Sequence, residues 1–342
     1  MKIIQVGSSG WASGWLSHIY SDDECELTAL VSRGGQNLEN AKEKWVIPSS
    51  ICFSDFDEAL KKECDLVIIA TPHPLHITFA RKAVEAGKNV IVEKPLTDDF
   101  DEAKAFAKSL KVCENKVWVS QNFRFRKPLW QMRASFSKNW IGKPAWADVS
   151  LRLGNSHKKF TEKTSWQRKD WRLNQTNMLL YELAIHQFDM MRFLVDSDVQ
   201  TVFARGWNPE WSDIDGIQAA DIILKFESGF KVNFNASSKS IGFATGYQGN
   251  WLVQTDLGCV RWDYDGENEF EPSVDSQATL CDEFFFPGHD RIGVLNEIKR
   301  QLNGEPGEVP DINDNIKSLA ISHAVLQSIQ ENRSISLAEI LD

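Results

Sequence analysis

The chain has 342 residues, of which 42% are hydrophobic and 25% charged, so its composition is that of a globular protein with room for two domains. A formal net charge of −10 excludes a nucleic-acid backbone or an anionic membrane surface as its main partner. No run approaches the roughly 20 apolar residues that span a bilayer, and no leader segment precedes the first apolar stretch. We therefore expect a cytoplasmic protein.

The first 120 residues alternate short apolar strands with helical patterns. The expected strands are Lys2–Val6, Leu27–Ser32, Leu66–Ala70, Asn89–Glu93 and Val117–Ser120, and the expected helices include Asp57–Glu63, Ile77–Ala86 and Phe100–Glu114. This alternation implies right-handed crossovers and a parallel sheet covered on both faces. We predict an N-terminal α/β domain over residues 1–122, with a doubly wound sheet of the Rossmann type.

After about residue 122 the pattern changes. A helix is expected near Asn177–Val195, followed by the longer alternating strands Ala219–Glu227, Phe230–Ser237 and Gly249–Thr255. Because no helical pattern separates these strands, they predict an antiparallel sheet. Near the C-terminus, Asn315 is expected to cap a last helix, Ile316–Glu331. Residues 123–342 are therefore expected to form a second, α+β domain.

The six cysteines are scattered and form no CxxC pair, so neither a disulfide framework nor a zinc cluster is expected. Most of them should be buried free thiols. They are Cys25, Cys52, Cys64, Cys113, Cys259 and Cys281.

The first strand runs into a glycine-containing turn, Gly7-Ser8-Ser9-Gly10-Trp11-Ala12, and then into a helical stretch. A strand, turn and helix in this order aim backbone N–H groups and the positive helix end at a pyrophosphate. Compared with GxGxxG, Ser9 replaces the second glycine and Ala12 the third. The side chain of Ser9 crowds the phosphate, although its hydroxyl can donate to it. The turn alone is equally typical of an ordinary strand–helix connection, and the surrounding alternation favours a dinucleotide site.

The second strand ends in Ser32-Arg33, where NAD-selective sites usually carry an acidic residue for the ribose 2′-hydroxyl. An arginine pairs well with a 2′-phosphate, and Ser32 adds a hydroxyl. We therefore expect NADP in preference to NAD. The alternative is that Arg33 is simply a solvated turn residue.

Several further motifs follow one another in a distinctive order. They are Thr71-Pro72 with His76, Ala86-Gly87-Lys88, Glu93-Lys94-Pro95, Gln121 to Phe125, Asp170-Trp171-Arg172, and Glu182 with His186 and Asp189. Together they resemble the Gfo/Idh/MocA family, which includes glucose–fructose oxidoreductase and inositol dehydrogenases. The resemblance covers the first domain and the start of the second. It implies a Rossmann domain, an α+β domain with a large, mostly antiparallel open sheet, and a homodimer or homotetramer.

Oxidation of a secondary alcohol needs a group that takes the hydroxyl proton and a positive group near the developing alkoxide. Lys94 follows a parallel strand, at the sheet edge where ligands bind. The resemblance implies that Lys94 reaches the substrate hydroxyl. The alternative is a surface lysine in contact with Glu93.

Glu182 and His186 are four residues apart, so on a regular helix they share one face and the carboxylate can orient the imidazole. The resemblance makes His186 the general acid/base, although inositol-dehydrogenase relatives have Asp where this chain has the longer Glu182. The alternatives are a core histidine and half of a metal site. No second pair of this kind stands out, so no metal is expected.

The remaining candidates surround these groups. The resemblance implies that the dinucleotide is lined by Thr71, Pro72, His76, Glu93, Lys94 and Asn122, and the substrate by Arg124, Trp171 and Arg172. His76 is expected to be a structural cap rather than a catalyst, and each arginine can instead form an interdomain ion pair. The thirteen tryptophans suit sugar rings, but most large aromatic side chains are simply buried anchors.

We therefore expect an enzyme that transfers a hydride between NADP or NAD and a sugar, inositol or related polyol. Three other interpretations stay open. The substrate can be a non-sugar of the dihydrodiol type. The chain can be a catalytically silent dinucleotide sensor that regulates a partner protein, or an enzyme that recycles tightly held NAD within each turnover.

Overall fold

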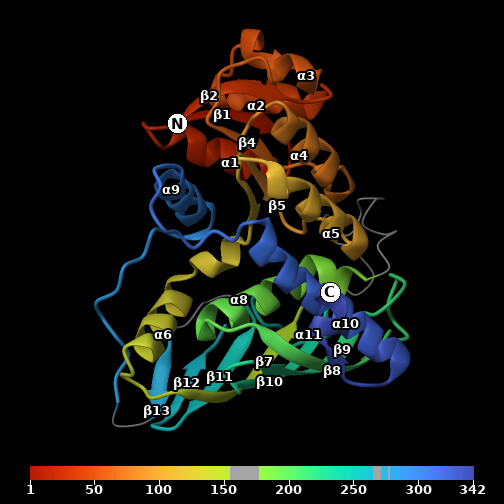
Figure 1. The fold of residues 1–342 in the computed structure, drawn as a ribbon, viewed down its shortest axis with the longest axis vertical. Coiled ribbons are helices and arrows are strands. Elements are labelled where there is room, and N and C mark those ends of the chain that lie inside the picture. The colour runs from red at the N-terminus through yellow and green to blue at the C-terminus, as the bar shows by residue number, and fades with distance from the viewer. Residues whose placement is uncertain (155–176, 265–270, 276–277) are drawn as a thin grey trace. The chain divides into compact units, whose positions relative to one another are not determined.

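The computed structural model describes residues 1–154, 177–264, 271–275 and 278–342 (Figure 1). The chain divides into two compact units. The first consists of Met1–Asn122 and Pro287–Ile316, and the second of Phe123–Phe286 and Lys317–Asp342. Within the described residues, no helix is both long and apolar enough to cross a membrane.

The first unit is built on a six-stranded sheet with strand order β3-β2-β1-β4-β5-β6. All neighbouring strands in it are parallel. The strands are β1 (Lys2–Val6), β2 (Glu26–Val31), β3 (Cys52–Phe53), β4 (Leu66–Ile69), β5 (Val90–Glu93) and β6 (Val117–Ser120). The prediction of a doubly wound parallel sheet is confirmed. The two-residue strand β3 was not expected, because its sequence is too short to show a pattern.

Helices alternate with these strands. They are α1 (Trp11–Tyr20), α2 (Gln36–Trp45), α3 (Phe56–Ala59), α4 (His76–Glu85), α5 (Phe100–Ser109) and α9 (Asp290–Leu302), with 3₁₀ turns at Ser49–Ile51, His73–Leu75 and Leu110–Val112. Helix α3 is shorter than expected. Beyond Ala59 the N–H groups of Lys61 and Lys62 bond three residues back rather than four, which ends the helix as a tight turn. Helix α5 likewise ends at Ser109 and continues only as a 3₁₀ turn.

Residues 287–316 return to the first unit, whereas we expected all of 123–342 in the second. Polar contacts explain the return. The N–H of Val119 donates to the carbonyl of Pro310 at 2.9 Å, which adds this segment to the outer edge of β6. Helix α9 is tied to the loop before β2 by Lys299, whose ammonium lies 2.6 Å from Asp22.

The second unit contains an eight-stranded sheet with strand order β13-β12-β11-β7-β10-β9-β8-β14. The strands are β7 (Pro144–Arg152), β8 (Val199–Trp207), β9 (Ala219–Phe226), β10 (Lys231–Ser237), β11 (Asn250–Thr255), β12 (Cys259–Trp262), β13 (Ser273–Asp275) and β14 (Ile335–Ser336). Neighbouring strands are antiparallel except β7 and β10, which run parallel. The expected large, mostly antiparallel sheet is confirmed.

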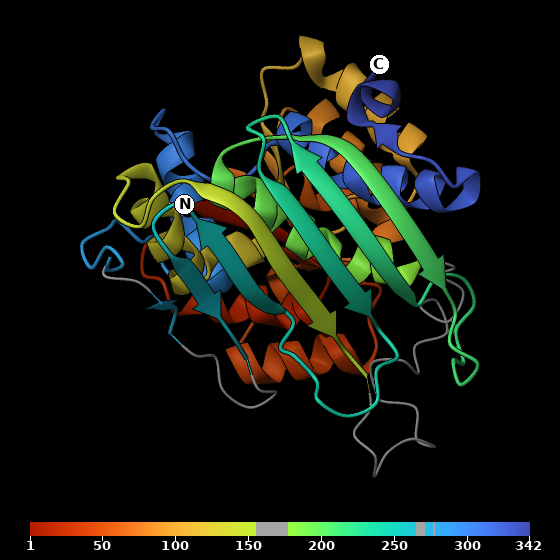
Figure 2. The same cartoon turned by 90° about the horizontal axis from the view of Figure 1, so that it is seen from below.

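One face of this sheet is packed and the other is open. Along β7, Ala147, Val149 and Leu151 are buried, while Trp146 before Ala147 and Asp148 after it are exposed. This alternation is typical of a sheet with helices on one side only. Figure 2 shows the open side, with no described helix of this unit in front of the strands. Among the described residues, the α-helices of the unit are α6 (Lys127–Ser137), α8 (Ile185–Val195), most of α10 (Ile312–Glu331) and α11 (Leu337–Leu341).

Two of the expected helices begin at other residues in the structure than the sequence predicted. The stretch Asn177–Val195 is not one regular helix, because Leu179–Leu183 form a π-helical turn before α8. The N–H of Ala184 accordingly bonds to the carbonyl of Leu179, five residues back. Helix α10 begins at Ile312 and so includes Asn315. The side chain that caps its first turn belongs to Asp311, which accepts from the N–H of Asp314 at 2.8 Å.

All six cysteines are free thiols. Only Cys281 is buried, Cys113 is exposed and the other four are partly exposed, so the expectation that most are buried was wrong. Burial is still large enough at Cys25 to raise the pKa of its thiol to about 11. Among the described residues, no group of three or more His, Cys, Asp or Glu side chains is placed to hold a metal ion.

Candidate functional site

The turn after β1 lies where three strand ends converge. Gly7 has φ +110°, and its N–H donates to the carbonyl of Val31 at the end of β2 at 2.9 Å. A Cβ on Gly7 would lie 2.5 Å from the carbonyl oxygen of Ala70, which follows β4. Only glycine fits this conformation and this spacing. The backbone conformation at position 7 and its contact with Ala70 therefore both require a glycine there.

The side chain of Gln5, in β1, stabilises the same turn. Its buried side-chain amide donates to the carbonyls of Gly7 and Ala12, each at 2.9 Å. The sequence analysis did not identify Gln5, because a polar residue inside an apolar strand has no motif of its own. A glutamine buried in a strand directly before a glycine turn is the signal that was available.

Helix α1 begins at Trp11, immediately after Gly10, which has φ +57°. No side chain caps this helix, and its first turn contains no acidic residue. The N–H groups of Ala12 and Ser13 bond to the carbonyls of Ser9 and Gly10 at 3.1 and 3.2 Å. The positive end of the helix dipole at this start favours an anion such as a pyrophosphate. Of the two departures from GxGxxG, Ser9 is exposed and Ala12 is buried.

The structure brings two hydroxyl groups together at the ends of β1 and β2. The Oγ atoms of Ser8 and Ser32 lie 2.9 Å apart, and the N–H of Gly34 lies 3.4 Å from Ser32 Oγ. The Arg33 side chain next to them is exposed. This turn therefore presents hydroxyls and a guanidinium, and no acidic side chain, at the edge of the sheet where an adenosine ribose binds in such folds.

His76 connects two neighbouring turns. It is 1% exposed, with Nδ1 2.8 Å from the carbonyl of Pro95 and Nε2 2.8 Å from the carbonyl of Thr71. Burial lowers its pKa, which favours the neutral ring at pH 7. Pro72, in the turn after β4, is exposed. His76 thus connects the turn after β4 to the turn after β5 through its two ring nitrogens. The Lys94-Pro95 peptide in the second of these turns is cis.

Two further candidates of the first unit already have polar partners. Glu93 is 7% exposed, and its Oε1 accepts from Trp15 Nε1 and from Arg291 Nε, each at 2.8 Å. Asn122 is buried and donates to Asp290 at 2.7 Å. Lys94 itself is partly exposed directly after β5. Neither Arg291 nor Asp290 was singled out from the sequence, because both belong to the returning helix α9.

In the second unit, His186 is buried in the first turn of α8. Its ring is stacked on Phe123, with ring centroids 4.1 Å apart and an interplanar angle of 18°. The guanidinium of Arg126 lies 4.7 Å from the centroid of the same phenyl ring. This packing restrains the imidazole, as general acid/base work requires. Phe123 follows Asn122 in the motif from Gln121 to Phe125 and was not given a role from the sequence.

Glu182 is also buried, but it lies in the π-helical turn before α8. The four-residue spacing between Glu182 and His186 therefore crosses a junction between two kinds of helix. The assumption of one regular helical face does not apply there. π-helical turns occur frequently at functional sites, because they redirect the side chains of one turn.

Arg124 was expected at the substrate wall, but it forms a bidentate ion pair within the unit. Its Nε and one terminal nitrogen donate to the two oxygens of Asp189 at 2.6 and 2.8 Å, and both side chains are buried. Ser318 donates to the same carboxylate at 3.0 Å. Arg124 thus fixes the third member of the Glu182, His186 and Asp189 motif in place. Trp171 and Arg172, the other expected substrate contacts, lie outside the described residues, as does Asp170.

Replacing Gly7 with Asn tests the glycine turn. At φ +110° an asparagine is strained in its backbone, and its Cβ would in addition clash with the carbonyl of Ala70. We expect dinucleotide affinity to fall by at least about tenfold, in line with the cost of an over-packed site. The control is Gly229→Asn, since Gly229 has φ +89° and nothing within 4 Å of its added Cβ. Unchanged affinity in Gly7→Asn, measured by quenching of tryptophan fluorescence, would contradict the assignment.

Comparison with known proteins agrees with this geometry. A family described as "Oxidoreductase family, NAD-binding Rossmann fold" matches residues 1–121, and its partner, the GFO/IDH/MocA C-terminal domain, matches residues 129–255. The chain belongs to the Gfo/Idh/MocA family. Members of the Gfo/Idh/MocA family are nicotinamide-dependent oxidoreductases that act on CH–OH groups, and the chain is an enzyme of this class.

Named Gfo/Idh/MocA relatives cover most of the chain at low identity. Inositol 2-dehydrogenase of Rhizobium meliloti is 25% identical over 81% of this chain and 82% of its own length. Myo-inositol 2-dehydrogenase of Thermotoga maritima is 23% identical over 93% of each protein. An oxidoreductase of Agrobacterium radiobacter, solved with NAD+, L-tartaric acid and magnesium, has the same fold, with a TM-score of 0.82, 19% identity and coverage of 100% of this chain and 99% of the other.

Proposed function

We propose that the chain transfers a hydride between a nicotinamide dinucleotide and the secondary alcohol or ketone of a sugar, inositol or related polyol. One observation carries this proposal. The glycine turn after β1 and Lys94 after β5 follow strands of one parallel sheet, so both lie at its carboxyl edge. Two relatives named inositol 2-dehydrogenase support the substrate class.

The residues of the turn fit a dinucleotide. There is no room for a side chain at Gly7, and the start of α1, which no side chain caps, presents the positive end of the helix dipole to a pyrophosphate. When bound, the nicotinamide accepts or donates the hydride. Lys94 stabilises the developing alkoxide by its positive charge, and His186 takes or returns the hydroxyl proton. Phe123 holds the imidazole by stacking, and Glu182 completes the motif before α8.

We also propose NADP as the preferred cofactor, because Ser32 and the exposed Arg33 follow β2 where NAD-selective sites carry an acidic side chain. Titration of the purified protein with NADPH and with NADH, followed by tryptophan quenching, tests this. We expect NADPH to bind at least about tenfold more tightly, and Arg33→Ala to remove most of the difference, as loss of a charge-assisted contact requires. The control is Lys143→Ala, which removes an exposed lysine of the second unit. Tighter NADH binding would reverse the cofactor choice.

A panel of sugars, inositols and polyols with the preferred dinucleotide then tests the function itself. Reduction of the dinucleotide by one member of the panel supports the proposal. Tight dinucleotide binding with no product from any member would instead favour a silent sensor. Product without a net absorbance change would favour a recycled, tightly held cofactor. Absence of binding to either dinucleotide would contradict the enzyme assignment.

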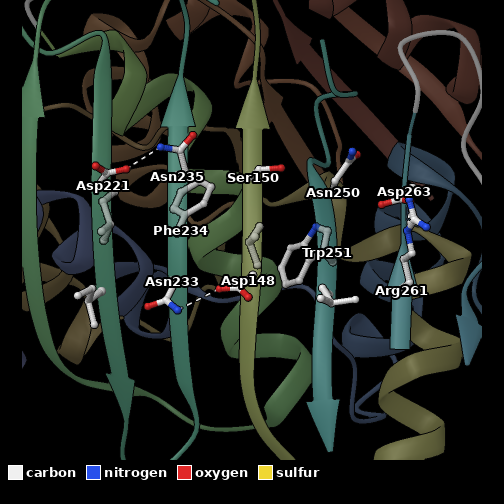
Figure 3. A pocket seen from close by; sticks show the side chains of 14 residues that line it. Asp148, Ser150, Asp221, Asn233, Phe234, Asn235, Asn250, Trp251, Arg261 and Asp263 are labelled. Atoms are coloured by element: carbon white, nitrogen blue, oxygen red, sulfur yellow. Dashed lines mark hydrogen bonds and ion pairs between the residues drawn. The ribbon is translucent and has the colours of Figure 1, made fainter. Parts of the chain in front are cut away.

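The open face of the eight-stranded sheet supports a proposed homo-oligomer. Polar side chains pair across neighbouring strands on this face, Asp148 with Asn233 at 3.0 Å and Asp221 with Asn235 at 2.6 Å (Figure 3). They line a shallow hollow of about 560 Å³ together with Ile223, which is 51% exposed. The hollow contains neither Lys94 nor His186, so we assign this face to a second copy of the chain rather than to substrate.

Replacing Ile223 with Glu tests this contact. A charge added at Ile223 would be buried against the second copy without a partner, which is costly, so we expect a dimer or tetramer to dissociate at micromolar concentration. The measurement is molar mass by light scattering after size exclusion. Val46→Glu is the control, because Val46 is 86% exposed in the first unit. A monomeric parent protein, or an Ile223→Glu variant with the mass of the parent oligomer, would refute the assignment.

A further inference from the structure

Gln121, the first residue of the motif from Gln121 to Phe125, has polar atoms that the fold itself does not satisfy. It directly follows β6, and its side chain is buried, with 1% exposed. Both ends of its amide, Nε2 and Oε1, are buried and have no hydrogen-bond partner among the described residues. Buried polar groups in folded proteins are nearly always hydrogen-bonded. An unpaired donor and an unpaired acceptor on one buried amide therefore indicate a ligand group that pairs with both.

Three other buried polar side chains at this edge of the sheet already have partners. Glu93 accepts two hydrogen bonds, Asn122 donates one, and both ring nitrogens of His76 bond to carbonyls. The hydroxyl groups of Thr71 and Ser120, in contrast, are buried and have no partner within the described chain. Unsatisfied polar atoms are thus found after β4 and at the end of β6, one on each side of β5.

Strand register places Gln121 next to Lys94. Glu93, the last residue of β5, is the Cα partner of Ser120, the last residue of β6, in a parallel pair. Lys94 and Gln121 are the next residues of the two strands, so their backbones leave the sheet side by side, one strand spacing of about 4.8 Å apart. Thr71 and Lys94 are partly exposed, so this part of the carboxyl edge is open to a ligand.

The strand order assigns this part of the edge to the nicotinamide half of a dinucleotide. The order reverses between β1, which the glycine turn follows, and β4. In sheets of this order the two nucleotides lie on opposite sides of the reversal. Since Ser32 and Arg33 follow β2 on the adenosine side, the nicotinamide half lies over the ends of β4, β5 and β6. β6 is three strand spacings from β1, about 14 Å, a distance that the nicotinamide, its ribose and a glutamine side chain span together.

A carboxamide is the ligand group that matches a glutamine side chain most closely. Both are primary amides, so an N–H of each donates to the carbonyl oxygen of the other in one plane. The nicotinamide ring carries a carboxamide as its polar substituent. A polyol hydroxyl, in contrast, has a single donor that rotates freely, so it does not require a fixed pair of donor and acceptor atoms.

We infer that Gln121 binds the carboxamide of the nicotinamide and thereby fixes which face of the ring is turned toward the substrate. Rotation about the bond between ring and ribose exchanges the two faces, and a carboxamide held by two hydrogen bonds allows one orientation only. This inference rests on the proposed function, because it concerns how the proposed cofactor is held.

Ligand analogues test this inference by binding alone. Isothermal titration calorimetry compares the oxidised dinucleotide, its 3-acetylpyridine analogue and ADP-ribose, each in the 2′-phosphorylated form if the protein prefers NADP. The acetyl group accepts a hydrogen bond but has no N–H to donate, and ADP-ribose has no ring. We expect the parent to bind the dinucleotide about fivefold to tenfold more tightly than the acetylpyridine analogue, as the loss of one buried hydrogen bond implies. Equal affinities in the parent would overturn the inference.

The variant Gln121→Met keeps the length of the side chain and removes both amide atoms. In this variant the two ligands that carry a ring should bind within about twofold of each other, because neither substituent finds its partner. The affinity for ADP-ribose should stay within about twofold of the parent. The parent's ratio between the ring ligands, if retained in the variant, would refute the contact. An equal loss for all three ligands would also refute it, because a merely structural residue acts on all of them alike.

The matched control is Gln301→Met. The amide of Gln301, in α9, donates to the carbonyls of Gly307 and Val309 at 3.2 and 3.3 Å. Its backbone carbonyl accepts from Lys116, which precedes β6, so this glutamine lies near the amino end of that strand. The substitution should lower the melting temperature and leave the ratio between the ring ligands unchanged. A changed ratio in this control would count against the inference, because the ratio would then report loosened packing rather than contact with Gln121.

Should Gln121→Met fail to fold, Gln121→Asn takes its place. Asparagine keeps the amide but is one methylene shorter, so the preference for the carboxamide should fall below that of the parent. An undiminished preference in Gln121→Asn would show that another group binds the carboxamide.

The outcomes also separate this inference from the proposed function. A parent protein that prefers the carboxamide but oxidises no polyol refutes the function and supports the role of Gln121. Turnover together with equal affinities for the two ring ligands refutes only the role of Gln121. Absence of binding of every dinucleotide refutes both.

Discussion

Replacing Lys94 with methionine is expected to lower turnover by about a thousandfold while leaving dinucleotide affinity within about threefold of the parent. Methionine keeps most of the side-chain length but has no charge and no exchangeable proton. Loss of a positioned proton-transfer or alkoxide-stabilising group typically costs a factor of about 10² to 10⁴ in rate. Since the loss concerns the transition state, it should reduce kcat and kcat/KM together.

The matched control for this variant is Lys88→Met. Lys88 precedes β5, so it lies at the amino end of the strand whose carboxyl end leads into Lys94. The same substitution at the opposite edge of the sheet should change turnover by less than about twofold, as expected for a surface position remote from ligand. A Lys94→Met variant that retains most of its turnover would show that Lys94 is only a surface lysine.

Replacing His186 with alanine is the second large effect. Turnover is expected to fall by about a hundredfold to a thousandfold, because the group that moves the hydroxyl proton is lost. Dinucleotide affinity should stay within about twofold, since the proposed role of His186 concerns the substrate hydroxyl and not the dinucleotide. The falling limb of kcat/KM toward low pH, where an imidazole base is protonated, should also disappear in this variant.

Two companion variants sharpen the His186 result. His323→Ala removes a partly exposed histidine of α10 and should leave turnover unchanged within about twofold. Phe123→Leu keeps an apolar side chain but removes the ring on which His186 is stacked. It should reduce turnover by about tenfold, because a looser imidazole is less often in the reactive geometry. Full activity in both His186→Ala and Phe123→Leu would assign His186 to the core.

Asp189 lies at the centre of a hydrogen-bonded network in the second unit. It receives Arg124 and Ser318, and Ser318 in turn accepts from Arg192 at 2.8 Å. These contacts bind α8 to the segment that contains Arg124 and to α10. A buried, fully hydrogen-bonded network of this kind holds side chains in one arrangement. These contacts therefore hold the helix that carries His186, and stacking on Phe123 holds its ring.

Local sequence pattern was sufficient for the parts of the molecule that depend on neighbouring residues. Apolar runs separated by helical stretches predicted the parallel sheet, and the bounds of β1 and β6 match the expected strands. The glycine at position 7 also follows from the motif, because a tight turn between a strand and a helix needs a positive φ. Each of these features is set within a few residues along the chain.

Only the tertiary structure decided which distant side chains meet. Glu93 was expected to contact the cofactor, yet its carboxylate is bound by Arg291, 198 residues away. Arg124 was expected at the substrate or in an ion pair between domains, and its observed partner is Asp189, 65 residues away in the same unit. The sequence pattern also did not predict that residues 287–316 return to the first unit, or that Leu179–Leu183 form a π-helical turn. Motifs identify which residue types carry the chemistry, but a charged side chain takes its partner from whatever the folded chain brings within about 3 Å, and spacing along the sequence does not encode that distance.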